Sequence, residues 1–586
     1  MNIAITGEGV ISAIGVDKAS VLESLREGRS GIGEMRYLPS SHHELPVGEV
    51  KWSDEELRSR LSLDSSKKVS RTTMMGMWAV RQALEDAGYH SEGKPTKIVL
   101  ISGTTVAGMD LSERYFAEMV NSGGHLEYLL DHSCGDCTRH IAEHFGIFTD
   151  YTTISTACSS AANSLILGAN LLKAGEADIV VAGGTEALSL FHLNGFNSLM
   201  ILDKDRCRPF DDQRAGLNLG EGAAYVVMES EEHARQRQAP IHAWLSGYGN
   251  ACDAFHQTAS SDNGEGAYLA MCEAIDMAGL KPADIDYVNA HGTGTPNNDQ
   301  SESVALQRVF GSNLPPVSST KGFTGHTTSA SGSIETVICL LAMHHGFIPA
   351  NLGFQHPMAS GITPSLGSEG CTLRHVLCNS FGFGGNDTSL LLSSESVRPD
   401  HLESLEPVTK IRELARVEIT SEDQLSEIRE FVKPMEARRM GKLMKASLLT
   451  SLKALKQAGV DSPDAIITGT ALGCWENSEA LLMQLQEEGE VMLSPTNFMQ
   501  STHNTISSNI AIRLGCHGYN VTYTQGDDSL EWALRDARLL LNSGRYKTVL
   551  VGCHDETTPL YRSLMERLGV KDLPSIHSVA VVLSIK

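Results

Sequence analysis

Several features that mark whole classes of protein are scarce or missing in this sequence. Only 12 of the 586 residues are cysteine, and they are scattered, which excludes a disulfide-stapled scaffold and suits a reducing compartment. No run of about 18 apolar residues is present, so no membrane-spanning helix is expected. The chain begins with MNIAITGEGVISAIG, which lacks the basic and long apolar segments of a secretion signal. We therefore expect a cytoplasmic protein.

Basic residues are also few. The chain has 47 Lys and Arg against 71 Asp and Glu, which gives a formal net charge of −24. Such a protein repels nucleic acid and anionic membrane at long range, so neither is an expected partner. An acidic protein partner would need a local basic patch.

Metal-ligand motifs are nearly absent as well. One CxxC motif joins Cys134 and Cys137, with His132 and His140 nearby. No second CxxC follows at the spacing of a zinc site, so the motif favours the start of a helix on the surface. We expect no metal.

The sequence does contain an alternation of apolar strands and amphipathic helices. Strands are predicted within 97–106, 178–188 and 286–296, and helices within 78–89 and 267–280. This alternation predicts an α/β fold with mostly parallel or mixed sheets. The chain is too long for one hydrophobic core, so several domains are expected.

A change in composition divides the chain. Residues 398–410 are polar and include two prolines, which is typical of a linker. We predict an enzyme-like region at 1–397, a linker at 398–407 and a second region at 408–586.

The second region repeats the pattern of the start of the first. The matches occur in the same order at nearly constant offset, which indicates duplication, although any two α/β units share some pattern. The matched pairs are 78–88 with 449–459, 99–108 with 465–474, and 173–186 with 542–555.

Cys158 is the strongest candidate for a reactive group. A β-branched strand ends at Thr156, and a helix rich in small residues follows Cys158 within 151–175. Free amides and the positive end of a helix dipole would stabilise a thiolate at such a turn. A cysteine among small residues is more often a core filler, so this pattern by itself leaves both interpretations open.

Three later motifs favour catalysis. His291 lies at the end of a strand in NAHGTGTPNNDQSE (289–302). Lys321 and His326 are five residues apart in SSTKGFTGHTTSASG (318–332), and a glycine-rich turn follows in NSFGFGGNDTSL (379–390). Each motif has a structural explanation by itself, but four in this order indicate an active site.

With these motifs, residues 1–397 resemble the elongating β-ketoacyl-acyl-carrier-protein synthases and the ketosynthases of polyketide assembly. The resemblance rests on TACSSA, AHGTGTP, TKGFTGH and FGFGG, and on residues 206–224 and 253–267. It implies the thiolase-like α/β fold, with αβαβα layers built from two similar halves, here about 1–235 and 236–397. It also implies a homodimer, or a dimer-like pairing with a second ketosynthase-like domain.

The resemblance also assigns roles to the polar residues of the motifs. Cys158 would be the nucleophile that takes an acyl chain from an acyl carrier protein. His291 and His326 would face it. Lys321 would pair with Glu302 and keep the polar site in order.

The FGFGG turn would complete the site. The backbone amides of Cys158 and Phe383 would form an oxyanion hole, and Phe383 would act as the gate between the two half-reactions. The family usually continues GFGG with Thr and Asn, whereas this chain has Asn386 and Asp387, which puts the contacts of this loop in question.

Other residues would bind the substrate and its carrier. The pantetheine arm and the acyl chain would contact Thr293, Thr295, Val106 and Phe381. The acidic carrier protein would dock on a basic patch, either at Lys67, Lys68 and Arg71 or at Lys204, Arg206 and Arg208. No cofactor is implied beyond the phosphopantetheine of that carrier.

These roles imply a decarboxylating Claisen condensation. The Cys158 thiolate would attack an acyl thioester, and a malonyl thioester would lose carbon dioxide to give an enolate that His291 and His326 stabilise. One alternative is a non-decarboxylating thiolase, but a thiolase would carry a second cysteine within the late motif, and Cys378 lies before FGFGG. A non-catalytic partner subunit is another alternative. Fatty-acid and polyene or polyketide pathways both stay open.

The second region lacks the catalytic residues. Thr524, Gln525, Gly526 and Asp527 stand where a nucleophilic cysteine would be, and no counterparts of the later motifs follow. Residues 408–586 therefore resemble an inactive N-terminal half of the same fold. They are also similar to a truncated form of the chain-length-factor partners of polyketide ketosynthases.

Overall fold

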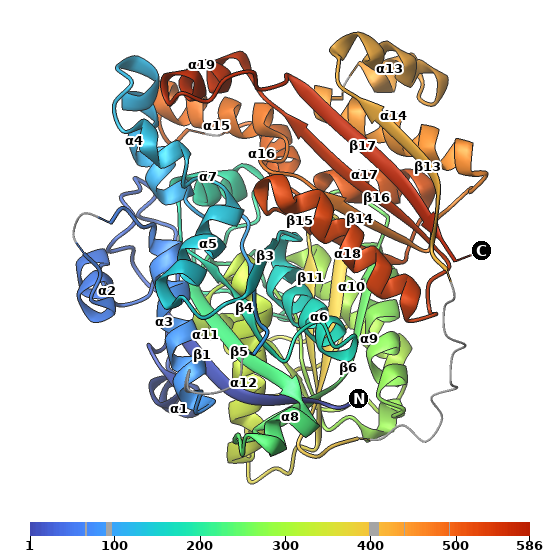
Figure 1. The fold of residues 1–586 in the computed structure, drawn as a ribbon. Coiled ribbons are helices and arrows are strands. Elements are labelled where there is room, and N and C mark those ends of the chain that lie inside the picture. Colours follow the sequence, from blue (N-terminus) through green and yellow to red (C-terminus); the bar gives the residue numbers. More distant parts are fainter. Residues whose placement is uncertain (65–66, 90–95, 398–409, 439, 492, 586) are drawn as a thin grey trace.

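The computed structural model describes residues 1–64, 67–89, 96–397, 410–438, 440–491 and 493–585. These residues form three consecutive units of sheet and helix (Figure 1). We refer to residues 1–236 as the first unit, 237–397 as the second and 410–585 as the third. The predicted linker at 398–407 lies outside the described residues.

The first unit is a mixed sheet with the strand order β3-β2-β4-β5-β1. Alternate side chains of each strand face opposite sides, so both faces are apolar and buried. Ile179 and Val181 of β4 pack in one core with helix α3, while Val180 and Ala182 pack in another with α6. The elements are β1 (Ile3–Ser12), α1 (Lys18–Glu27), α2 (Asp54–Leu61), α3 (Arg71–Asp86), β2 (Ile98–Gly103), α4 (Met109–Asn121), η1 (Leu126–Leu129), α5 (Cys134–Phe145), β3 (Asp150–Ile154), η2 (Ala157–Ser159), α6 (Ser160–Lys173), β4 (Ile179–Glu186), α7 (Leu190–Ser198), β5 (Gly222–Ser230) and α8 (Glu231–Gln236).

The second unit supplies the other half of a layered fold. Its main sheet has the order β6-β12-β11-β7-β8, with α12 beside α6 on the inner face and α9 and α10 on the outer face. Together the two units give the five αβαβα layers of the predicted thiolase-like fold. The elements are β6 (Ala243–Cys252), α9 (Glu265–Met277), η3 (Pro282–Asp284), β7 (Tyr287–Asn289), α10 (Pro296–Phe310), β8 (Val317–Ser318), α11 (Lys321–Thr324), η4 (Thr328–Ala330), α12 (Ser331–His345), β9 (Phe347–Ile348), β10 (Ser368–Glu369), β11 (His375–Gly382) and β12 (Asn386–Ser393).

The third unit repeats the first. Its strand order, β15-β14-β16-β17-β13, is the order of the first unit element for element. Helix α14 covers the face that α3 covers, and α18 takes the place of α6. The elements are β13 (Arg412–Ile419), η5 (Glu422–Glu430), α13 (Pro434–Ala437), α14 (Lys442–Ala458), β14 (Ala465–Gly469), α15 (Trp475–Glu488), α16 (Pro495–Ser501), α17 (Thr505–Leu514), β15 (Tyr519–Tyr523), η6 (Gly526–Asp528), α18 (Ser529–Asn542), β16 (Thr548–Glu556), α19 (Pro559–Arg567) and β17 (Ile576–Ser584).

Matching side-chain contacts support the duplication. Glu186 at the end of β4 accepts hydrogen bonds from the Thr104 hydroxyl, at 2.8 Å, and from the two backbone N–H groups that follow. Asp555 near the end of β16 accepts the same set from Thr470, again at 2.8 Å, and from the next two N–H groups. The predicted repeat is therefore confirmed, and it includes the turns that follow β2 and β14.

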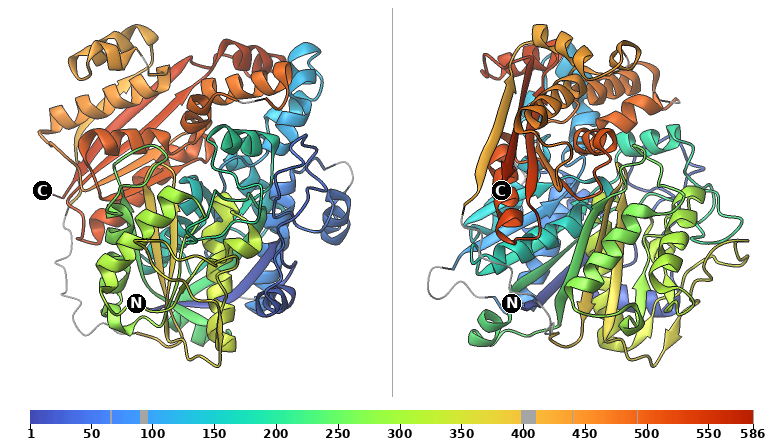
Figure 2. Two further views of the ribbon diagram at one scale, coloured as in Figure 1. Left: turned by 180° about the vertical axis from the view of Figure 1, so that it is seen from behind. Right: turned by 90° about the vertical axis from the view of Figure 1, so that its right-hand side faces the viewer.

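The third unit is joined edge to edge with the first. The Ser155 N–H donates to the Thr522 carbonyl and the Thr524 N–H donates to the Thr153 carbonyl, both at 2.9 Å, so β15 extends the sheet beyond β3. Figure 2 shows the third unit, in orange and red, lying across one end of the first. The predicted dimer-like pairing is thus made within one chain, and it covers the open edge of β3.

Among the helices of the described ranges, none is both long and apolar enough to cross a membrane.

Candidate active site

Cys158 sits in a strained turn between β3 and α6. The preceding Ala157 has φ of 51°, a left-handed conformation that an alanine adopts at a cost. The Ser160 hydroxyl holds the turn by accepting the Thr156 N–H at 2.9 Å and donating to the Ala157 carbonyl at 2.6 Å. Gly382 lies so close that an added Cβ would be 2.8 Å from the Thr156 carbonyl oxygen. The nucleophile turn and the FGFGG turn therefore pack directly together.

His326 is in contact with the nucleophile. Its Nε2 atom lies 3.0 Å from the Cys158 sulfur, and its Nδ1 atom lies 3.1 Å from the Ser331 hydroxyl. A hydroxyl can donate or accept. Ser331 can therefore support either tautomer of His326, with Nε2 as a proton acceptor or as a donor.

His291 faces the same space from the second unit. The rings of His291 and His326 are 5.3 Å apart, and one atom from each of Cys158, His291 and His326 lies within 4.8 Å of the others. Burial, with the ammonium of Lys321 adding to it, lowers the pKa of both imidazoles well below its usual value. The structure thus brings the three residues together with both rings neutral.

Lys321 orients His291, but it does not pair with Glu302 as predicted. Its Nζ donates to Glu335 at 2.6 Å, to the His291 carbonyl at 2.5 Å, and toward His291 Nδ1 at 3.3 Å. Because Nδ1 accepts, the ring proton of His291 is on Nε2. Glu302 lies on α10 behind the loop and instead accepts the N–H groups of His291 and Gly292, at 2.8 and 2.7 Å.

The sequence reasoning missed Glu335. It is the one acidic residue in the apolar helix α12, and a lone buried carboxyl group requires a partner. That pattern could have identified Glu335, although the sequence does not show which lysine pairs with it. Burial raises the pKa of Glu335, and the adjacent Lys321 opposes the rise.

The resting state of Cys158 differs from the prediction. Burial raises the pKa of its thiol to about 12, although Lys321 and the backbone N–H groups of Phe383 and Cys158 act in the opposite direction. The free enzyme therefore favours a neutral thiol, and the predicted helix-end thiolate is wrong for this state. The two N–H groups near the sulfur are the predicted oxyanion-hole donors.

The predicted substrate contacts lie in two places. Thr293 and Thr295 are hydrogen-bonded to each other at 2.8 Å. The segment that carries the exposed residues Lys204 and Arg206 packs beside them against Gly294. The Phe381 ring packs against His291 at 5.9 Å, while Val106 lines the cavity described below.

The other predicted docking patch is only partly on the surface. Arg71 is 7% exposed and forms an ion pair with Glu221 at 2.7 Å, so it is a buried structural residue and not a docking residue. Lys67 is exposed. Lys68 is also exposed but is paired with Glu127.

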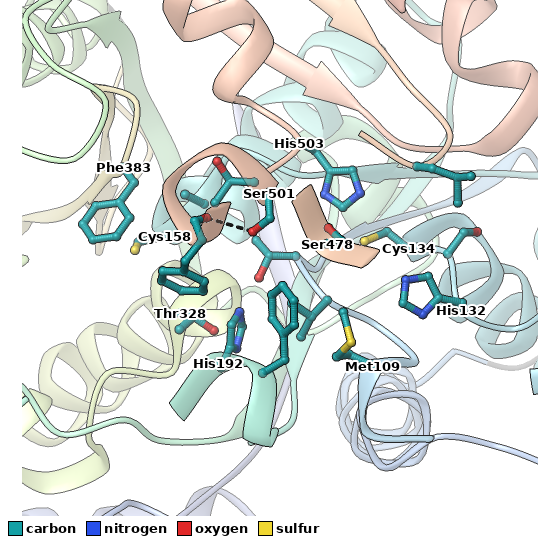
Figure 3. Close-up of a pocket in the computed structure, with 18 of the residues that line it drawn as sticks. Met109, His132, Cys134, Cys158, His192, Thr328, Phe383, Ser478, Ser501 and His503 are labelled. Carbon is teal, nitrogen blue, oxygen red and sulfur yellow. Dashed lines mark hydrogen bonds between the residues drawn. The ribbon is translucent and has the colours of Figure 1, made fainter. Parts of the chain in front are cut away.

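A cavity runs from Cys158 into the junction between the first and third units (Figure 3). The third unit contributes a substantial part of its wall, including Leu472, Ser478, Phe498, Ser501 and His503. These contacts were not predictable from the sequence, because they join residues more than 300 positions apart.

The CxxC motif also borders this cavity. Helix α5 begins at Cys134 as predicted, but Cys134 and Cys137 are buried and not on the surface. Cys137 accepts a hydrogen bond from Thr73 at 3.3 Å, and burial raises its pKa to about 12. Both cysteines are free.

The third unit also holds the FGFGG turn. Asn504 donates from its side chain to the Phe383 carbonyl at 2.8 Å. The Phe383 ring stacks on Phe196 with centroids 5.7 Å apart, and Phe196 contacts Phe498 at 5.3 Å. The predicted gate residue is therefore anchored by the third unit, in which Asp527 stands at the position of Cys158.

Family models match all three units. The N-terminal domain model of beta-ketoacyl synthase matches residues 1–234, and the C-terminal domain model matches 242–355. A second N-terminal domain model of the same name matches 413–585. The order of these matches agrees with the order of the sheets.

Curated proteins and solved structures agree with the family models. Nodulation protein E of Rhizobium meliloti (strain 1021) is 33% identical over 403 residues, covering 66% of this chain and 98% of that protein. 3-oxoacyl-[acyl-carrier-protein] synthase 2 of Coxiella burnetii is 32% identical over 417 residues, with 67% and 98% covered.

Two solved structures cover different shares of the chain. The ishigamide ketosynthase/chain length factor has a TM-score of 0.63 and 30% identity, covering 67% of this chain and 99% of its own. The PfaC keto synthase-chain length factor has a TM-score of 0.81 at 17% identity, covering 100% of this chain and 78% of its own. The second likeness concerns the fold alone, and it extends through the third unit.

Proposed function

We propose that this chain, which belongs to the β-ketoacyl synthase family, joins an acyl group to a malonyl unit by decarboxylating condensation, with both substrates carried on the phosphopantetheine of an acyl carrier protein. The observation that carries the proposal is the meeting of one thiol and two neutral imidazoles, with the backbone N–H groups of Cys158 and Phe383 beside the sulfur. Each of these groups has a task in one of the two half-reactions.

The first half-reaction is acyl transfer. His326 Nε2 takes the proton of the Cys158 thiol as the sulfur attacks the acyl thioester. The oxyanion that forms is held by the N–H groups of Cys158 and Phe383. When the intermediate collapses, the pantetheine sulfur leaves and receives the proton from His326.

The second half-reaction makes the carbon–carbon bond. The malonyl group loses carbon dioxide, and the electron pair moves to the thioester oxygen as an enolate. The Nε2–H of His291 donates to that oxygen, and His326 does so in its other tautomer. The enolate carbon then attacks the acyl carbonyl on Cys158, the C–S bond to Cys158 breaks, and the released thiolate takes up one proton that enters from solvent.

Two variants separate the half-reactions. We expect His326→Ala to slow both the loading of Cys158 and the condensation by at least about 10²-fold, because it removes the base and a donor. We expect His291→Ala to load Cys158 nearly normally and to lose condensation by a similar factor. Intact-protein mass spectrometry measures the loading, and release of labelled carbon dioxide measures the second step. Loading with acetyl thioesters but no turnover of malonyl thioesters would favour a thiolase instead.

We propose that the carrier protein docks near Lys204 and Arg206. These two exposed cations come just before Cys207 and Arg208, which pack against Gly294 between Thr293 and Thr295, where the pantetheine arm would enter. Charge reversal with Arg206→Glu is expected to raise the KM for the carrier several-fold with little change in kcat. Lys67→Glu is the matched control on the other patch.

We propose that residues 408–586 act as a chain-length-factor-like partner without catalysis of their own. Asp527 occupies the position of Cys158 in the repeat, and the third unit helps to wall the cavity next to the nucleophile. Removing residues 408–586 should change the length of the products. Products of unchanged length would show that the region does not influence chain length.

A further inference from the structure

Two imidazoles lie on the cavity wall away from the nucleophile. His132 comes from the first unit, just before α5, and His503 comes from the third unit, between α16 and α17. In Figure 3, Cys158 and Phe383 lie at one side of the cavity, His503 lies on the wall between, and His132 lies at the far side. Neither histidine takes part in the proposed condensation.

Each imidazole has one nitrogen engaged and one free. His132 Nδ1 is hydrogen-bonded to the Ser112 hydroxyl at 2.7 Å, and His503 Nδ1 to the Ser155 hydroxyl at 3.1 Å. Within the described ranges, neither Nε2 atom has a hydrogen-bond partner, and the Ser478 hydroxyl on the same wall also has none. Three groups that can donate or accept therefore remain available along this wall.

These groups carry no charge. Burial lowers the pKa of both His132 and His503 to about 4, so both rings are neutral at pH 7. The residues that line the cavity within the described ranges include no Lys, Arg, Asp or Glu. A carboxylate or an ammonium in this space would lose its hydration without gaining a counter-ion.

The part of the cavity near Cys158 is mainly apolar, in contrast to the far end. There the wall is formed mainly by the rings of Phe191, Phe196, Phe383 and Phe498, and the His192 ring lies edge-on to Phe196 and Phe498 with centroids 6.0 and 6.5 Å apart. An apolar chain segment suits these rings. An apolar chain end lying against His132 and His503 would leave the polar groups there without partners, which is costly in a buried site.

We propose that the far end of this cavity binds an uncharged hydrogen-bonding group, such as a hydroxyl or phenol, at the end of the acyl chain on Cys158. The inference rests on the proposed function, in which the cavity holds that chain. It names the substrate class as acyl chains with an apolar body and a neutral polar terminus. His132 and His503 are then specificity-determining residues.

The test compares pairs of acyl thioesters that differ only at the chain end. Full-length protein is loaded with saturated acyl groups of six to fourteen carbons, each with either a methyl or a hydroxyl terminus, and Cys158 acylation is followed by mass spectrometry. At the length that reaches the far end, we expect the hydroxyl-terminated chain to load about tenfold faster, as one or two buried hydrogen bonds would give. His132→Phe with His503→Phe should remove or reverse that preference.

Loading of a butanoyl group provides the reference. Each rate is divided by the butanoyl rate of the same variant, so damage to the nucleophile site is separated from a change in selectivity. If folding of the double variant fails, Ser478→Ala is expected to reduce the preference by a smaller factor. Lys445→Ala on the surface of α14 is the matched control and should leave the preference unchanged.

The outcomes separate the two proposals. If butanoyl loads but methyl-terminated chains load as fast as hydroxyl-terminated ones at every length, the inference is overturned and the condensing function stands. If no acyl group loads Cys158, the proposed function falls and the inference falls with it.

Discussion

At the scale of single residues, Cys158 combines an unfavourable ionisation with a base in contact. Burial raises its pKa to about 12, while His326 Nε2 lies 3.0 Å from the sulfur. Burial and Lys321 also keep the imidazole neutral. The thiol is therefore activated when a substrate arrives, by proton transfer to His326, and not by standing as a thiolate.

This state predicts a particular pH profile. Alkylation of Cys158 by iodoacetamide should keep rising with pH through 9, with no plateau between pH 6 and 8, because the thiolate fraction grows throughout that range. His326→Ala should keep the same rise with pH, because the rise follows the thiolate fraction of Cys158 and not the protonation of the imidazole. Peptide mass spectrometry resolves Cys158 from the other cysteines. A plateau from pH 6 would show a standing thiolate–imidazolium pair and contradict the prediction.

The buried pair of Lys321 and Glu335 predicts a non-additive effect on stability. Lys321→Met leaves Glu335 without its partner and should cost about 3–5 kcal/mol of unfolding free energy. Adding Glu335→Leu should recover most of that loss, because both charges are then gone. Condensation should stay abolished in both variants, since His291 has lost the group that holds its ring.

Urea unfolding and turnover, measured on the same preparations, check this pair. A double variant that is as unstable as Lys321→Met would show that the ion pair is not the source of the loss. Turnover that returns with stability would show that Lys321 does not orient His291.

Asp387 is a buried carboxyl group on β12, just after the FGFGG turn, and it predicts a pH effect. It is 6% exposed, and burial, with Asp253 and Glu302 adding to it, raises its pKa well above the usual value. A carboxyl group whose pKa is raised by folding stabilises the native state fully only below its unfolded pKa near 4. That contribution is lost as pH rises through the raised pKa. Asp387→Asn should therefore exceed wild type in stability by about 1–3 kcal/mol at pH 8, and by less at pH 5.

The neighbouring Asp253 provides the control for this prediction. It accepts hydrogen bonds from the N–H groups of Ser261 and Gly266 and from the Ser261 hydroxyl, at 2.6 to 3.0 Å. Asp253→Asn should destabilise the protein at both pH values. Unfolding in urea at pH 5 and pH 8 compares the two variants, and an Asp387→Asn advantage that does not change with pH would contradict the titration.

At the scale of elements, the FGFGG turn depends on a helix of the third unit. Asn504 precedes α17 and donates to the Phe383 carbonyl, and the residue after Phe383 is packed against Ser508, since a Cβ on Gly384 would be 2.1 Å from its hydroxyl oxygen. Asn504→Ala should lower kcat about tenfold or more, because a small displacement of the Phe383 N–H weakens the oxyanion hole. Asn477→Ala, which loses a contact within the same unit, should leave kcat unchanged. Equal effects of the two would mean that the third unit acts only through general stability.

Elements were also the level at which the sequence was most informative. The repeated strand–turn–helix pattern is local, so it predicted that the third unit copies the first. The motifs around Cys158, His291 and His326 predicted the three groups that meet. The ion-pair partner of Lys321 was not predictable in the same way. Lys321 could reach Glu302 on α10 or Glu335 on α12, and only the packing of these helices decides between them. Asn504 and His503 gave no signal, since their roles come from the β3–β15 junction.

At the scale of the whole molecule, the chain contains one complete thiolase-like fold and a second copy of its first half, and the two are joined at their sheet edges. The third unit repeats the first and occupies the β3 edge. Arg535 of α18 reinforces the junction with ion pairs to Asp150 at 2.8 Å and Glu176 at 2.6 Å. A second chain cannot pair along β3 while β15 is in place, so this edge is not available for a homodimer interface.

This geometry predicts the association state. The intact chain should be monomeric, with a mass near 63.2 kDa by light scattering after size exclusion. A chain ending at residue 397 should self-associate, because β3 would present a row of unpaired N–H and C=O groups. Arg535→Ala in the intact chain should stay monomeric, since half-exposed ion pairs contribute less than about 1 kcal/mol each and the backbone pairing of β3 with β15 remains. An intact chain of twice the mass, or a monomeric 1–397, would show that β15 does not substitute for a partner subunit.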